Sequence, residues 1–86
     1  MPEISRFFGI IIAMFHREHY PPHFHARYGS YMASIRIEDL AVVEGYLPPR
    51  ALGLVMEWAY MHKEELLNDW KLAMERKPLL PIEPLK

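Results

Sequence analysis

The sequence predicts a small α+β domain, in which an antiparallel sheet of three to four strands is followed by helical structure packed on one face. Two stretches with different patterns support this fold class. In the first half of the chain, apolar residues alternate with polar ones or form short β-branched runs, which is typical of strands. From residue 49 to 77, the apolar residues instead recur every three or four positions, as they do along one face of a helix.

Composition bounds the size and class of the domain. The 86 residues allow one hydrophobic core, and a chain with 51% hydrophobic and 24% charged residues is typical of a globular protein. The net charge of −1 provides no overall positive field, so nucleic acid could be bound only through a local patch. The absence of cysteine excludes disulfides and thiolate metal sites. The apolar run Phe7–Phe15 is too short to span a bilayer and lacks signal-peptide features, so we expect a cytoplasmic protein with no membrane partner.

Four segments have the composition of strands. The first is rich in β-branched and aromatic residues, and Gly9 allows a bend or bulge within it. The second and third alternate apolar and polar residues on either side of Gly29 and Ser30, a pair that favours a two-residue hairpin turn. The fourth has a weaker pattern. The predicted strands are Arg6–Phe15, His23–Tyr28, Tyr31–Glu38 and roughly Val42–Tyr46.

The predicted hairpin determines which side chains share a face of the sheet. With the turn at Gly29 and Ser30, alternate residues of its two strands form one apolar and one polar face. The apolar face is expected to meet the helical layer, through Phe24, Ala26, Ile35 and Ile37 on the sheet and Leu52, Val55, Ala59 and Leu66 on the helices. The polar face carries His23, His25, Arg27, Met32, Ser34 and Arg36. It is expected to stay uncovered unless the loop of residues 16–22, the C-terminal tail or another chain lies over it.

Residues 49–77 are predicted to form one long kinked helix or two consecutive helices. A proline such as Pro49 suits the first turn of a helix. An unbroken helix of this length would measure about 43 Å, more than the diameter of so small a domain, so we expect a break near Tyr60–Lys63. Prolines at positions 78, 81 and 84 exclude a further helix. We therefore predict a domain of residues 1–77 and an extended, Pro-rich tail of residues 78–86.

Histidines gather in the loop before the predicted hairpin and along its first strand. His23 and His25 are two residues apart on a strand, so their rings project from the same face. With His19 in the preceding loop, they are candidate ligands for zinc or another divalent metal in a site suited to hydrolysis. The alternative, which needs no ligand, is that they are solvated histidines on the outer face of a sheet.

A second chemical interpretation needs no metal. One histidine could act as base and the other as acid in RNA cleavage, while an arginine binds the phosphate. The catalytic candidates in that case are His23, His25, Ser34 and Arg36. Of the two tryptophans, Trp58 and Trp70, we expect one in the core and the other partly exposed, because the spacing between them places them on different sides of a straight helix.

Two blocks of sequence closely resemble a known family. The first comprises residues 1–10 and the run His-Tyr-Pro-Pro-His-Phe-His-Ala-Arg-Tyr-Gly of residues 19–29, and the second comprises residues 47–52, 57–59 and 62–66. Over nearly the whole chain they are similar to the bacterial family called domain of unknown function 4160. The resemblance implies no catalytic residue. It does imply a partner, because genes of this family often lie beside a gene for a second small protein, in an arrangement similar to toxin–antitoxin pairs.

These observations leave two classes of function. The first is a protein-binding member of a toxin–antitoxin-like two-gene module, without a cofactor, whose partner is a small protein encoded nearby; a homo-oligomer is a further option. Its candidate contact residues are Arg27, Met32 and Trp70. The alternative is a small histidine-dependent ribonuclease or a metal-dependent hydrolase that uses the face of His23 and His25. The sequence alone does not decide whether the protein is an enzyme.

Overall fold

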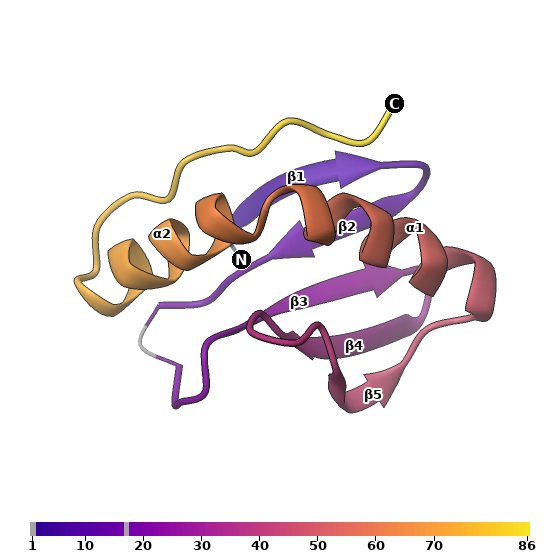
Figure 1. Cartoon of the computed structure of the whole chain (residues 1–86), viewed down its shortest axis with the longest axis horizontal. Helices are drawn as coiled ribbons and strands as arrows, with labels where there is room; N and C mark the ends of the chain where they lie inside the picture. Colours follow the sequence, from indigo (N-terminus) through magenta and orange to yellow (C-terminus); the bar gives the residue numbers. More distant parts are fainter. Residues whose placement is uncertain (1, 17) are drawn as a thin grey trace.

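A five-stranded antiparallel sheet, covered on one face by two consecutive helices, makes up the fold in a computed structural model that describes residues 2–16 and 18–86 (Figure 1). The strands follow one another in the sheet in the order of the sequence. The elements are β1 (Glu3–Phe7), β2 (Ile10–Ala13), β3 (His23–Tyr28), β4 (Tyr31–Arg36), β5 (Val42–Tyr46), α1 (Pro49–Met61) and α2 (Lys63–Met74). The predicted α+β class is therefore confirmed.

The sheet has five strands rather than the predicted three to four, because the segment Arg6–Phe15 is not one strand. Phe8 and Gly9 both have positive φ, 51° and 79°, and form a tight turn across which Phe7 pairs with Ile10. What was predicted as a bend at Gly9 is a complete reversal of the chain. The turn was not predicted because the apolar run continues through it, and because a phenylalanine is not a typical residue for a left-handed turn position.

The predicted register of the β3–β4 hairpin is confirmed. Phe24 pairs with Ile35, His25 with Ser34, and the strands meet at a turn in which Gly29 has a φ of 61°. β4 ends at Arg36 instead of Glu38, where a short loop begins and the Arg36 amide donates to the carbonyl of Ala41. β5 has the predicted bounds and contains one irregularity in its pairing with β4.

The apolar face of the sheet meets the helices as expected. Phe24, Ala26, Ile35 and Ile37 are buried, as are Val55, Ala59 and Leu66 on the helices, whereas Leu52 is only partly buried. Trp58 lies at the centre of this layer, with its ring 5.3 Å from Phe7 and 6.1 Å from Phe24. The core is thus built between one sheet face and one helical stripe.

The helical half consists of two helices that meet at His62, inside the predicted break. α2 ends at Met74, before the predicted Lys77, because Arg76 adopts a φ of 59° that a helix cannot continue through. Both tryptophans are buried, with Trp70 only 4% exposed, so the expectation that one of them is partly exposed is wrong. That expectation assumed a straight helix, and the interruption at His62 removes the assumption.

The C-terminal segment, residues 78–86, contains no helix or strand and lies beside β1 and the helices (Figure 1). Ile82 is buried and donates its amide hydrogen to the carbonyl of Ile4 at 2.8 Å. The indole of Trp58 donates to the carbonyl of Glu83, also at 2.8 Å. These bonds fasten the segment to the core. Within the described part of the chain, no helix has the length and apolar character needed to cross a membrane.

Among the described residues, Asp69 on α2 is the one carboxylate that is buried in the core, with an exposure of 1%. Its Oδ1 accepts a hydrogen bond from the amide of Leu80, and its Oδ2 has no partner among the described residues. Burial raises the pKa of Asp69, the bond from Leu80 opposes that rise, and the nearby charge of Glu65 adds to it. The folded protein therefore favours a protonated Asp69 more than the unfolded chain does.

The helical stripe can be tested with two adjacent leucines. Leu66 is fully buried, whereas Leu67 is 46% exposed. We expect Leu66→Ala to lower the free energy of unfolding by about 2–5 kcal/mol through the lost apolar contacts and the cavity left behind. Leu67→Ala, the control, should lower it by less than about 1 kcal/mol. Urea denaturation measures both, and equal losses would contradict the assigned orientation of α2.

The unusual environment of Asp69 predicts a pH-dependent difference between the wild type and Asp69→Asn. Because the folded pKa lies above the ordinary 3.8, the wild type loses stability as the pH rises from about 4 through the folded pKa, while the asparagine variant does not share this loss. Urea denaturation at a series of pH values from about 4 upward should show that the free energy of unfolding of Asp69→Asn rises relative to that of the wild type as the pH increases. Parallel stability curves would show that Asp69 titrates alike in both states.

Candidate functional site

The loop between β2 and β3 covers one end of the polar sheet face. The ring of Phe15 packs edge-on against His25, with centroids 4.7 Å apart, and the ring of Tyr20 packs against Trp70 at 5.9 Å. The Pro22 carbonyl accepts a bond from the Ile37 amide, which anchors the end of the loop to the chain just after β4. The loop thereby brings its polar residues over the start of β3.

Three side chains from this loop and β3 converge. The Oε1 atom of Glu18 lies 2.9 Å from Nε2 of His23 and 3.4 Å from Nε2 of His25. The three atoms all lie within 4.8 Å of one another. His23 is only 7% exposed, and Glu18 and His25 are partly buried. We call Glu18, His23 and His25 the His/Glu cluster.

The other nitrogen of each ring also has a partner. Nδ1 of His23 lies 2.8 Å from the carbonyl oxygen of Pro21, and Nδ1 of His25 lies 3.2 Å from the hydroxyl of Ser34. A carbonyl oxygen can only accept, so Nδ1 of His23 carries the hydrogen and donates it. In a neutral His23, the Nε2 lone pair then points toward Glu18.

The carboxylate of Glu18 and the ring of His25 have pKa values that are both shifted downward. Burial alone would raise the pKa of Glu18, but hydrogen bonds from His23 and His25 outweigh it and the pKa is lowered. Burial lowers the pKa of His25, only partly opposed by the hydrogen bond to Glu18. At neutral pH the cluster therefore combines an ionised carboxylate with a neutral His25.

A pocket of about 350 Å³ opens over the cluster. His19 and Tyr20 border it on the loop side, and Val43 and Glu44 border it on the β5 side. Among the described residues, its lining includes two carboxylates, Glu18 and Glu44, and neither lysine nor arginine. Such a lining attracts a cation rather than a polyanion.

The structure brings together some of the predicted site residues and separates others. His23, His25 and Ser34 share one hydrogen-bonded cluster. His19 borders the pocket, with its ring centroid 6.1 Å from that of His23, but it is not part of the group whose ligand atoms converge. Arg36 binds Asp39 through two hydrogen bonds of 2.9 and 2.8 Å, which lower the pKa of Asp39 to about 2, and it does not line the pocket.

The three candidate contact residues fall into two places. Arg27 and Met32 are paired neighbours on β3 and β4, and both are exposed on the polar face beyond the loop. Trp70 is instead buried, with its ring 5.2 Å from His23 and next to Tyr20. Its surroundings are those of a side chain that supports the loop and the His/Glu cluster from the helical side.

Two carboxylates of the site, Glu18 and Glu44, were not among the residues predicted from the sequence. Glu44 on β5 could have been predicted by extending the polar face from β4 to the next strand, because Glu44 pairs with Ser34 of β4. The position of Glu18 depends on the path of an irregular loop, which no periodicity describes. The order of the strands still gives a signal for Glu18. The loop between two adjacent antiparallel strands ends where the second strand begins, so its last residues lie near the start of β3.

Comparison with known proteins identifies the family without an activity. A family model described as "Domain of unknown function (DUF4160)" matches residues 9–71, a segment that contains the whole His/Glu cluster. No curated protein and no solved structure matches the chain.

Proposed function

Because the chain belongs to the family described as "Domain of unknown function (DUF4160)", whose description assigns no activity, we propose a function from its surfaces: it is a protein-binding member of a two-gene module similar to toxin–antitoxin pairs. The partner is the small protein encoded beside it, and the contact is an extended segment of that partner added to the open edge of the sheet. The proposal is supported chiefly by the exposure of β5.

The two edges of the sheet differ. β1 forms one edge, and there the C-terminal segment donates a hydrogen bond from Ile82 to Ile4. β5 forms the other edge; all five of its residues are exposed, and no strand lies beyond it among the residues that the structure describes. An exposed edge strand presents unpaired backbone groups, which can accept an extended peptide as a further strand.

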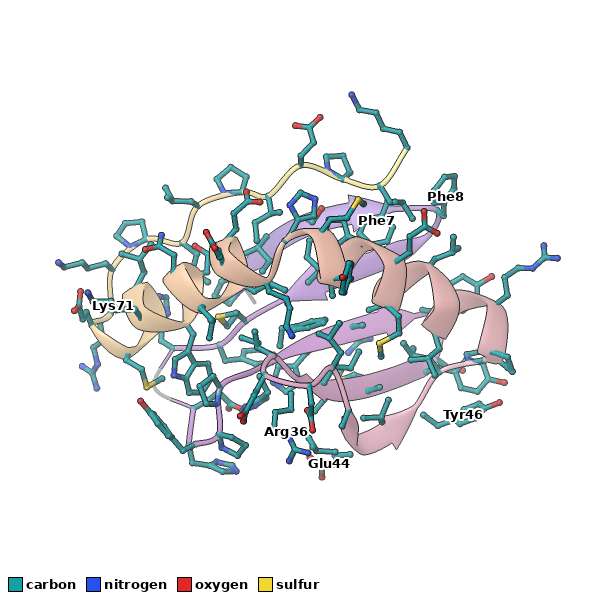
Figure 2. All side chains as sticks on the ribbon, viewed as in Figure 1. Phe7, Phe8, Arg36, Glu44, Tyr46 and Lys71 are labelled. Atoms are coloured by element: carbon teal, nitrogen blue, oxygen red, sulfur yellow. The ribbon has the colours of Figure 1, made fainter. Side chains whose placement is uncertain are left out.

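Side chains beside this edge add an apolar surface with a positive rim. Met32 and Tyr46 pair across β4 and β5 and are 36% and 58% exposed, and Arg27 pairs with Met32 on the other side. Figure 2 shows Tyr46 at one end of β5, away from Glu44. We call Arg27, Met32 and Tyr46 the interaction patch. Tyrosine and arginine are the residue types that often dominate binding energy, and methionine adapts to different partners.

The chemistry of the patch describes the expected partner segment. Apolar side chains on one face of the added strand would contact Tyr46. Met32 and Arg27 lie one and two strands further into the sheet, so the part of the partner that follows the added strand would contact them, with an acidic residue opposite Arg27. Tyr31, whose ring lies 5.8 Å from that of Tyr46, supports the edge from the neighbouring strand.

The partner interaction is tested by co-expressing the chain with the protein encoded next to it and measuring affinity by calorimetry. Tyr46→Asp and Met32→Asp should each weaken binding by roughly 30-fold or more, the effect of losing a central contact of about 2 kcal/mol. Tyr60→Asp is the matched control, since Tyr60 is an exposed aromatic residue of α1. It should leave the affinity unchanged.

Two results would contradict the proposal. One is a folded wild-type chain that stays monodisperse and ignores the neighbouring protein. The other is a loss of affinity in Tyr60→Asp equal to that in Tyr46→Asp. Self-association that Tyr46→Asp abolishes, without any binding of the neighbouring protein, would assign the edge to a second copy of this chain instead.

A second candidate function, an enzyme that uses the face of His23 and His25, is favoured by the pocket over the His/Glu cluster. Of its two forms, a metal-dependent hydrolase fits better than a metal-free ribonuclease. Arg36 is already bound to Asp39, and the described pocket lining offers no cation for a phosphate. Two histidines and a carboxylate are a known ligand set for hydrolytic zinc.

The enzyme candidate predicts a toxic activity that depends on His25. Expression of the wild type should inhibit growth, and His25→Ala should relieve the inhibition while circular dichroism shows an intact fold. His16→Ala is the control, since His16 contacts the Lys77 carbonyl rather than the cluster. Undiminished inhibition by folded His25→Ala would exclude this function.

A further inference from the structure

The His/Glu cluster has the atoms of a metal site at suitable separations. Tetrahedral zinc with ligand bonds of about 2.0–2.1 Å places its ligand atoms about 3.3 Å apart. The carboxylate oxygen of Glu18 lies 2.9 Å from the nearer Nε2 and 3.4 Å from the other. All three atoms lie within 4.8 Å of one another, so side-chain rotations that shorten the longest of these separations would bring them to one ion.

The hydrogen bonds around the cluster prepare the histidines to act as ligands. A metal-binding histidine commonly donates its second ring hydrogen to a carbonyl or carboxylate, which fixes the tautomer and the ring orientation. His23 does so through Nδ1 to Pro21, and His25 can do so through Nδ1 to the Ser34 hydroxyl. In both rings Nε2 is then the free donor atom, and both Nε2 atoms face the same oxygen.

This arrangement requires a positive charge between His23 and Glu18. With Nδ1–H committed to Pro21, a neutral His23 directs its Nε2 lone pair at the oxygen of Glu18, 2.9 Å away. Two lone pairs at that distance repel, so a proton or another cation must lie between them. A proton can serve one nitrogen, whereas a divalent ion serves both nitrogens and the carboxylate together.

The residues that line the pocket favour a divalent ion over a proton. The pocket adds Glu44 near the cluster, and its described lining includes no lysine or arginine. One side of the cluster faces the pocket and leaves room for water or a small ligand.

We propose that Glu18, His23 and His25 bind one divalent transition-metal ion, with zinc as the best match, through Oε1 and the two Nε2 atoms. Ser34 is a positioning residue that orients His25, and the remaining coordination positions face the pocket. The site differs from the predicted set of three histidines in that Glu18 replaces His19. It is independent of the interaction patch, so partner binding and metal binding can fail separately.

The test uses the full chain with any histidine tag removed, stripped of metal and titrated with Co²⁺ and then Zn²⁺. The wild type should bind one Co²⁺ per chain with visible absorption bands, which Zn²⁺ displaces. Glu18→Gln and His25→Ala should each weaken binding by at least about 100-fold, since they remove a ligand, and Ser34→Ala by about 10-fold, since it removes only a support. His19→Ala, the matched control, borders the same pocket and should bind within a few-fold of the wild type.

Thermal unfolding separates a metal site from a charge pair that merely fastens the loop. Zn²⁺ should raise the melting temperature of the wild type and of His19→Ala, but not that of Glu18→Gln, because an ion that binds only the folded state stabilises it. If His25→Ala fails to fold, Glu18→Gln still decides the matter. A folded wild type that binds no Co²⁺ or Zn²⁺ in a one-to-one ratio would overturn the proposal. So would a loss in His19→Ala as large as that in Glu18→Gln.

Discussion

The period-two alternation of the β3–β4 hairpin is the constraint on which the rest of the molecule depends. One register places Phe24 and Ile35 under the helices and His25 and Ser34 on the opposite face. A slip of one residue would exchange these sets, exposing the core and burying the histidines. The hydrophobic effect that buries one face of the hairpin therefore also holds the side chains of the opposite face in position.

The polar face is divided between two environments by the loop that precedes β3. At the start of β3, loop residues cover His23 and His25 and supply a carboxylate, which produces a partly dry, hydrogen-bonded cluster. Toward the hairpin turn, Arg27 and Met32 remain exposed beside the open edge. One sheet face thus combines a recessed site, where desolvation strengthens electrostatic interactions, with a flat and adaptable surface.

Sequence patterns were sufficient wherever a single periodicity governed the chain. The hairpin register follows from alternation, and the break at His62 follows from the length that an unbroken helix would have. Patterns failed where the determinant was a backbone conformation with no compositional sign, as at Phe8, whose positive φ turns one predicted strand into two.

The same difference between periodic strands and irregular segments decided which site residues could be predicted. His23 and His25 could be placed together because they lie on one strand, and Ser34 because it lies opposite. Glu18 could not, because it lies in an irregular loop whose path no periodicity describes. The burial of Trp70 escaped prediction because its position was judged on a straight helix, whereas α2 begins after a break at His62 and places the Trp70 ring against Tyr20 of the loop and His23 of β3.

The bonds from the C-terminal segment make the protection of one sheet edge depend on residues 82 and 83. When the segment is detached, the indole of Trp58 loses the carbonyl of Glu83 that receives its hydrogen, and Ile4 at the edge strand β1 loses the bond from Ile82. Detachment, whether before the segment docks during folding or after proteolysis, gives a form with two open sheet edges, in which strands associate readily with other chains. Docking of the segment protects the edge at β1 and leaves β5 as the open edge.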